Sequence, residues 1–133
     1  MKMRKGYKFE DEVTLSKGTS EETDKMIEEN SREHIHAHEE ARMILDGSGY
    51  FDVRDVYDQW IRIEARPGDM LVIPAGAYHR FILDENNMLK CKRLFPGCDP
   101  VWKAIYRPQA DTHDVRKQYI QKHICTDCCS PCC

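Results

Sequence analysis

Residues His34 to Gly47, HIHAHEEARMILDG, decide the fold of this chain. The stretch places two histidines two residues apart, a glutamate four residues after the second histidine, and a glycine seven residues after the glutamate. Residues two apart in an extended strand point to the same face, so His34 and His36 can aim their imidazoles at one point. Glu40 follows a short turn and offers a carboxylate. The stretch therefore predicts three ligands of one metal ion.

A second stretch, GDMLVIPAGAYHRF from Gly68 to Phe81, supplies the fourth expected ligand. Its Pro-Ala-Gly sequence is typical of a turn, so His79 opens a new strand. The spacings H-x-H-x3-E-x6-G and G-x5-P-x-G-x2-H lie about 20 residues apart and are similar to the two motifs of cupin barrels. A single H-x-H is weak evidence, whereas both spacings in this order are strong evidence for His79 as a ligand.

Short apolar runs divided by turns surround both stretches. Runs of four to eight residues without intervening helices favour an all-β sandwich or barrel. Because such a barrel lets distant strands converge on an interior metal, we expect an all-β cupin jelly-roll barrel. The expected strands are Ala41–Leu45, Tyr50–Val53, Trp60–Glu64, Met70–Ile73, His79–Leu83 and Met88–Phe95.

Two helices are expected outside these strands. Thr19 followed three residues later by Glu22 has the pattern of a capping box, which predicts a short helix to about residue 29 with Met26 and Ile27 facing the protein body. A second helix is expected over residues 112–124. We therefore divide the chain into an N-terminal lead-in of an extended segment and a short helix, a cupin barrel with the metal site, and a C-terminal helix with a cysteine-rich tail. These parts comprise residues 1–33, 34–108 and 109–133, respectively.

Composition limits the function classes. The chain has 133 residues, enough for one domain, and a formal net charge of −3, which gives no electrostatic reason to expect nucleic acid or a membrane surface as a partner. No apolar run approaches the ~18 residues of a membrane span, and the N-terminal sequence MKMRKGYKFEDE lacks the apolar core of a signal peptide. We expect a monomer in the cytoplasm, or also in the nucleus.

The cysteines are unevenly placed. Five of the seven lie in the final nine residues, CTDCCSPCC, which is unlike the spread of a disulfide framework, so reduced thiols are expected. Three interpretations of this ending remain open. It could bind zinc or another soft metal, resemble a doubly prenylated terminus, or form a solvent-exposed tail.

Strand parity places two arginines beside the expected ligands. Arg42 has the parity of Glu40, and Arg93 shares the face of Cys91. Burying a guanidinium is costly unless an anion accompanies it, so two inward arginines favour an anionic ligand. The alternative is that one of them pairs with a structural carboxylate such as Asp52 or Asp55.

The chain resembles the acireductone dioxygenase family over about residues 33–108, in HIHAHEEARMILDGSGYFDVRD, DQWIRI, GDMLVIPAGAYHRFILDENN and RLFPGCDPVWKAIYRP. The resemblance implies one Fe(II) or Ni(II) ion per monomer, catalytic roles for Arg42 and Glu40, and two sets of site residues. The metal ligands would be His34, His36, Glu40 and His79, and the residues that line the substrate pocket would be Arg42, Phe81, Arg93 and Trp102.

The resemblance also implies a reaction of methionine salvage. Its Fe(II) enzymes convert 1,2-dihydroxy-3-keto-5-methylthiopentene and O2 to 4-methylthio-2-oxobutanoate and formate, whereas the Ni(II) form yields 3-methylthiopropanoate, formate and carbon monoxide. The predicted ligand set is compatible with an anionic enediol substrate, because three imidazoles and one carboxylate leave two positions of an octahedral dication open. Arg42 would hold the anionic form by a charge-assisted hydrogen bond.

The chain departs from the resembling sequences in three places, and two alternatives follow. Its segment before the barrel is shorter, Asn30 stands where the family commonly carries an aromatic residue, and the tail beyond Ile124 is unlike the usual ending. One alternative is a catalytically weakened metal-binding cupin that acts as a regulatory or interaction protein. The other is a cupin enzyme that acts on a different enol.

Overall fold

Two antiparallel β-sheets make up most of the protein. A computed structural model describes residues 6–124. One sheet has the strand order β1-β8-β3-β6 and the other β5-β4-β7-β2-β9. The strands are β1 (Phe9–Ser16), β2 (His34–Ile35), β3 (Glu40–Gly47), β4 (Gly49–Arg54), β5 (Trp60–Ala65), β6 (Met70–Ile73), β7 (His79–Leu83), β8 (Met88–Phe95) and β9 (Ile105–Tyr106).

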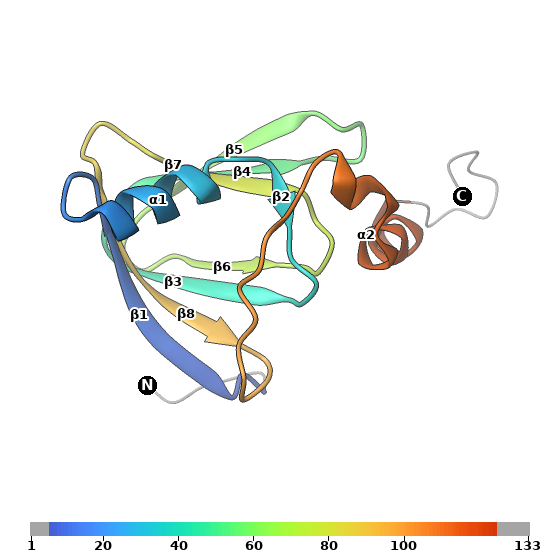
Figure 1. Cartoon of the computed structure of the whole chain (residues 1–133), viewed down its shortest axis with the longest axis horizontal. Helices are drawn as coiled ribbons and strands as arrows, with labels where there is room; N and C mark the ends of the chain where they lie inside the picture. The colour runs from blue at the N-terminus through green and yellow to red at the C-terminus, as the bar shows by residue number, and fades with distance from the viewer. Residues whose placement is uncertain (1–5, 125–133) are drawn as a thin grey trace.

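The two sheets lie face to face, and the chain crosses between them repeatedly (Figure 1). This arrangement is the jelly-roll barrel of the cupin fold, so the expected all-β architecture is confirmed. β1, which comes from the N-terminal lead-in, pairs with β8 along its whole length and forms one edge of its sheet. The helix α1 (Glu21–Asn30) and the C-terminal helix α2 (Asp114–Tyr119) lie at opposite sides of the barrel in this view (Figure 1).

The interior is filled by side chains that alternate along the strands. Residues of one parity face the opposite sheet and are buried, while their neighbours face outward. The main cluster contains Leu15, Ile44, Phe51, Ala65, Ile73, Ala77, Phe81, Leu89 and Cys91. A smaller cluster of Tyr7, Ala41 and Leu94 packs separately and contacts Met70. The metal centre described below adjoins the main cluster.

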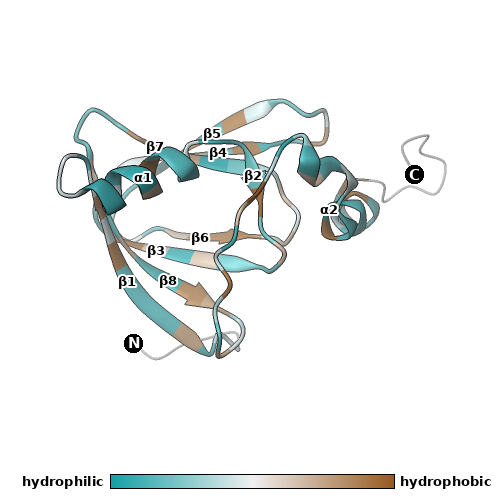
Figure 2. Ribbon diagram, viewed as in Figure 1, coloured by the Kyte–Doolittle hydropathy of each residue, from teal (hydrophilic) through white to brown (hydrophobic). Residues whose placement is uncertain are grey.

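Helix α1 begins one residue later than predicted, and one of the two residues that were expected to face the protein body is exposed. Its N-cap is Ser20, whose Oγ accepts a hydrogen bond from the backbone N–H of Thr23 at 3.1 Å, so Thr19 is not the cap. Ile27 packs against the main cluster as expected, but Met26 is 37% exposed. No residue of α1 is fully buried, and Figure 2 shows its mostly hydrophilic colour. The helix therefore covers the barrel without entering its core.

The expected C-terminal helix is divided into three short parts. A 3-10 helix (Gln109–Thr112) precedes α2, and a π-helical turn (Ile120–Ile124) follows it. The first junction lies at His113, whose backbone is extended and whose side chain caps α2 by accepting a hydrogen bond from the backbone N–H of Val115. Within residues 6–124, no helix is both long and apolar enough to cross a membrane. The cysteine-rich ending lies outside the described residues.

Candidate metal centre

Three of the four predicted ligands meet at one point inside the barrel. His34 on β2 lies directly opposite His79 on β7, and His36 follows one residue after β2 ends. One candidate ligand atom from each imidazole lies within 4.8 Å of those of the other two. All three side chains are buried. The arrangement brings together histidines that are more than 40 residues apart in sequence, as the two motifs predicted.

Each imidazole is oriented by a backbone carbonyl. The Nδ1 atoms of His36 and His79 lie 3.1 and 2.8 Å from their carbonyl oxygens, and His34 makes the same kind of contact. Since a carbonyl only accepts, each Nδ1 must donate its proton, which leaves the Nε2 lone pair free to bind a cation. The carbonyls belong to Arg32 for His34, Lys103 for His36 and Ala77 for His79.

The three histidines are neutral at physiological pH. Burial lowers the pKa of His36 to about 3, with the neighbouring His34 acting in the same direction. Burial also lowers the pKa of His34, and it lowers that of His79 well below its ordinary value. Neutral imidazole is the form that binds metal ions. The same burial that makes protonation unfavourable therefore keeps these side chains ready to act as ligands.

Glu40, the first residue of β3, lies beside this cluster with one oxygen unused. Its side chain is 1% exposed, and Oε1 accepts a hydrogen bond from Arg42 Nη2 at 2.9 Å. Oε2 is buried and has no hydrogen-bond partner among the described residues, although it lies 3.4 Å from Nδ1 of His36, which is directed to its own carbonyl. Burial raises the pKa of Glu40 and Arg42 opposes that rise. The oxygens of Glu40 are not in the group of ligand atoms that all lie within 4.8 Å of one another, but Glu40 lines the same inner cavity as the three histidines. An unpartnered buried oxygen in that cavity fits a bound dication.

The predicted substrate residues divide between two connected spaces. Arg42 and Phe81 line an inner cavity of about 40 Å³ together with the four predicted ligands. Arg93 and Trp102 line an adjoining outer cleft of about 530 Å³, which Arg42 also borders. The guanidinium carbons of Arg42 and Arg93 lie 5.2 and 4.2 Å from the centre of the Trp102 ring. Arg42 is therefore one of the residues that border both spaces.

Arg93 forms an ion pair with a carboxylate outside the predicted ligand set. Its Nε and Nη2 donate to the two carboxylate oxygens of Asp11 on β1 at 2.9 and 2.6 Å. The alternative of a structural ion pair thus applies to Arg93, although the acid is neither Asp52 nor Asp55. Asp52 accepts hydrogen bonds from two other arginines, and Asp55 accepts from backbone N–H groups of its own turn.

Two further residues reach the site. Asn30 at the end of α1 and Cys91 on β8 line both the inner cavity and the outer cleft. The parity of β8 had placed Cys91 on the inner face, whereas only the resemblance had drawn attention to Asn30. The nearby His38 and Glu39 point elsewhere: the His38 ring packs on Phe95, and Glu39 accepts a hydrogen bond from Tyr7. The carbonyl of Lys103 could not have been found, because a backbone acceptor leaves no signal in the sequence.

Comparison with known proteins gives one consistent result. A sequence profile of the ARD/ARD' family matches residues 1–104. Acireductone dioxygenase 1 of Physcomitrium patens is 50% identical over 126 residues, which are 95% of this chain and 64% of that relative. Acireductone dioxygenase of Gallus gallus is 52% identical over 115 residues, 86% of this chain and 63% of that relative. This chain thus spans less than two thirds of the length of these relatives.

A solved structure with a similar fold contains a metal ion. Acireductone dioxygenase from Bacillus anthracis, described with a cadmium ion in its active centre, superposes with a TM-score of 0.69 at 31% identity. The match covers 76% of this chain and 57% of that protein. In this relative, a barrel of the same fold holds a metal ion.

Proposed function

The chain belongs to the ARD/ARD' family, and from that premise we propose that it is a metal-dependent acireductone dioxygenase. The substrate would be acireductone, 1,2-dihydroxy-3-keto-5-methylthiopentene, an enediol that reacts with O2 in methionine salvage. One observation supports this proposal above the others: the unpartnered Oε2 of Glu40 lies buried beside three imidazoles whose Nδ1 atoms are bonded to carbonyls.

The metal ligands in this proposal are His34, His36, Glu40 and His79, all within residues 34–108. The preceding segment contributes β1 to one sheet of the barrel. A bound Fe(II) or Ni(II) ion would supply Lewis acidity toward the substrate's oxygens and redox chemistry with O2, and which of them is bound would select the products. Zinc suits the reaction less well, because it has no redox chemistry.

Arg42 would bind the deprotonated substrate. Its guanidinium lies at the junction of the two spaces, and two of its N–H groups are used, one on Glu40 and one on the carbonyl of Ala41. The others can donate to an enediolate oxygen, and a charge-assisted bond of that kind favours the anion over the neutral enediol. Arg42 would thus hold the substrate in its electron-rich form. Phe81 and Trp102 would supply apolar contacts to the methylthio end.

The cellular setting follows from the substrate. Acireductone is a small soluble metabolite, so we propose that the protein acts as a monomer in the cytoplasm, or also in the nucleus. Neither a nucleic acid nor a membrane is needed for this function.

The proposal is tested by oxygen uptake with acireductone on Fe-loaded and Ni-loaded protein, followed by product analysis. We expect formate from both forms and carbon monoxide only from the nickel form. Glu40→Ala should lose tight metal binding, whereas the matched control His38→Ala should keep it, because His38 packs on Phe95 outside the cluster. Equal metal content in wild type and Glu40→Ala would contradict the ligand assignment.

A second candidate is a metal-binding cupin without turnover. It is favoured by Asn30, which lines both spaces at a position where the resembling sequences commonly have an aromatic residue. Protein that binds one equivalent of iron but consumes no oxygen with acireductone would support this candidate and contradict the first. Oxygen consumption with a different enol, and none with acireductone, would instead indicate a cupin enzyme of another specificity.

A further inference from the structure

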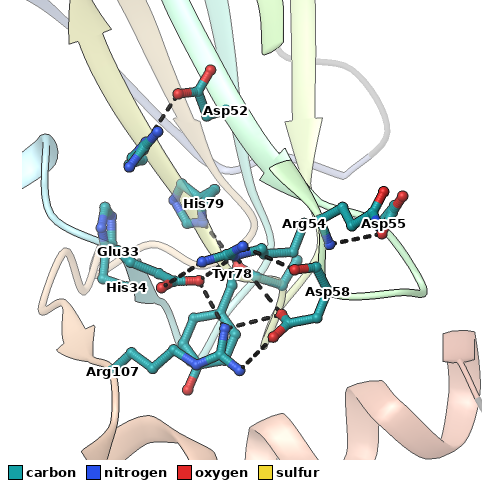
Figure 3. A network of polar contacts seen from close by, with 12 residues as sticks. Glu33, His34, Asp52, Arg54, Asp55, Asp58, Tyr78, His79 and Arg107 are labelled. Atoms are coloured by element: carbon teal, nitrogen blue, oxygen red, sulfur yellow. Dashed lines mark hydrogen bonds and ion pairs between the residues drawn. The ribbon is translucent and has the colours of Figure 1, made fainter. Parts of the chain in front are cut away.

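Arg107 lies at the centre of a polar network that touches the residues immediately before two of the proposed ligands (Figure 3). Its Nη1 donates to Glu33 Oε2 at 2.9 Å, and Glu33 precedes His34. The Arg107 guanidinium carbon lies 4.4 Å from the centre of the Tyr78 ring, and Tyr78 precedes His79. One side chain therefore contacts the residues that immediately precede both ligand strands, β2 and β7.

A third contact fixes the Arg107 side chain in place. Its Nη1 and Nη2 donate to the two carboxylate oxygens of Asp58, each at 3.0 Å. Asp58 lies in the turn between β4 and β5 and has a left-handed backbone conformation with a φ of +62°. The Asp58 carbonyl also accepts a hydrogen bond from Arg54 Nη1 at 2.9 Å. Arg107 thus links Glu33, which precedes β2, to the turn that follows β4.

The network contains the guanidinium groups of Arg54 and Arg107 and the carboxylates of Glu33, Asp58 and Asp111, and it is partly shielded from water. Glu33 accepts two hydrogen bonds from Arg54, at 2.7 and 3.2 Å, besides the one from Arg107. Burial would raise the pKa of Glu33, but these hydrogen bonds hold it below its ordinary value. The side chains of Glu33, Arg54 and Arg107 are 18%, 20% and 26% exposed. Because Arg54 also binds Glu33, loss of Arg107 leaves this carboxylate paired.

The backbone around Arg107 serves the ligands directly. β9 pairs with β2 so that Tyr106 lies opposite His34, and the Arg107 N–H donates to the Glu33 carbonyl at 3.2 Å. Four residues before Arg107, the Lys103 carbonyl accepts the Nδ1 proton of His36. The segment 103–107 therefore orients His36 and pairs with His34, and Arg107 fastens the end of that segment to β2.

We propose that Arg107 is a positioning residue of the metal centre, which holds segment 103–107 against β2 and thereby orients the imidazoles of His34 and His36. The inference rests on the metal site of the proposed function. Arg107 itself touches neither the cavity nor the ligand atoms and acts through its neighbours. Loss of groups that orient metal ligands typically raises the dissociation constant about 10- to 100-fold, and we expect a change of that size for Arg107→Ala.

The test is a Ni²⁺ titration of metal-free protein, with the unfolding midpoint of the same metal-free samples measured alongside. Arg62→Ala is the matched control, because Arg62 also donates two hydrogen bonds to one carboxylate, that of Asp52, and Asp52 retains Arg80 when Arg62 is lost. We expect a dissociation constant about 10- to 100-fold higher for Arg107→Ala, and within twofold of wild type for Arg62→Ala, even where the two midpoints fall equally.

A second variant and a spectroscopic measurement separate positioning from a general loss of stability. Arg107→Lys keeps the charge but cannot reach Glu33 and Asp58 together, so its dissociation constant should lie between those of wild type and Arg107→Ala. The Arg107→Lys variant also tests the positioning role if Arg107→Ala does not fold. The Co²⁺-loaded variants should show altered visible absorption, since those bands depend on ligand geometry, while the control should match wild type.

The outcomes distinguish the two proposals. Wild type that binds no Ni²⁺ would refute the metal site and with it the proposed function. Wild type that binds Ni²⁺, with both Arg107 variants within twofold of it and unchanged Co²⁺ spectra, would overturn the positioning role alone. An equal loss of affinity in Arg62→Ala would also overturn it, because the effect would then be one of general stability.

Discussion

Replacing Glu40 with Gln should separate stability from metal binding. The side chains have nearly the same shape, and a glutamine carbonyl can still accept the hydrogen bond from Arg42 that Oε1 accepts now. What is lost is the charge on a buried carboxylate whose Oε2 has no partner among the described residues. Burial of that charge raises the pKa of Glu40, so the charged form is disfavoured in the folded protein, and the uncharged amide avoids this cost. We therefore expect the metal-free variant to be as stable as wild type or more stable.

The size of the metal effect can be estimated by linkage. At a free metal concentration 100 times the wild-type dissociation constant, binding stabilises the native state by about 2.7 kcal/mol. Loss of the one charged ligand should weaken binding by at least the ~100-fold seen for groups that only orient ligands. The same metal concentration would then add about 0.4 kcal/mol. For a chain of 133 residues the difference, about 2.3 kcal/mol, corresponds to about 8 °C in the unfolding midpoint.

The assay is thermal unfolding of wild type and Glu40→Gln, each with and without Ni²⁺. We expect a large upward shift with metal for wild type and a small one for the variant, while the two metal-free midpoints agree or the variant lies higher. Equal metal-induced shifts would refute the assignment of Glu40 as a ligand. A metal-free variant that unfolds several degrees below wild type would show instead that Glu40 is retained for structure.

Three further predictions concern other parts of the molecule. Gly76→Ala should lower the unfolding free energy by more than about 2 kcal/mol in a denaturant titration, because φ is +83° and a Cβ would lie 2.6 Å from the Val115 carbonyl oxygen. Asp52→Asn should cost about 1–3 kcal/mol at pH 7. Hydrogen bonds from Arg62, and then Arg80, lower the pKa of Asp52 below 3.8, so the charged carboxylate stabilises the folded protein above that pH. The difference in unfolding free energy between wild type and Asp52→Asn should therefore disappear as the pH falls below 3.8. Arg42→Gln should reduce kcat/KM for acireductone by about 10- to 150-fold in oxygen uptake, the effect of losing one charge-assisted hydrogen bond.

The strands next to the motifs were predictable because turn residues mark their ends. β6, β7 and β8 begin and end at the expected residues, with Pro74 and Gly76 separating the first two. The extended strand expected to hold both His34 and His36 is shorter than expected, since β2 ends at Ile35, and β9 was missed, because a two-residue strand shows no alternation. The pairing of β1 with β8 joins segments about 80 residues apart, and nothing local in either strand specifies its partner.

In the candidate site too, features set by strand alternation could be predicted from the sequence, whereas contacts between distant residues could not. Parity placed Arg42 and Cys91 on the inner face, and both line the cavity. Parity also placed Arg93 there, but its direction is set by Asp11, a residue 82 positions away in the sequence. Side-chain direction along a strand can thus be predicted, whereas the partner that a charged side chain finds depends on the assembled barrel.

The metal centre depends on more of the chain than its proposed ligands. β2 has two residues and is paired on both sides, with β7 and with β9, so His34 is fixed by its neighbours and not by a long strand of its own. His36 lies beyond the end of β2, and its imidazole is oriented by the Lys103 carbonyl. Because an imidazole must point its lone pair within a narrow range to bind a metal, that carbonyl matters as much as the choice of histidine. Segment 103–107 therefore takes part in the metal centre although it contributes no proposed ligand. The two motifs identify the side chains proposed to bind the metal, but they do not contain the groups that orient those side chains.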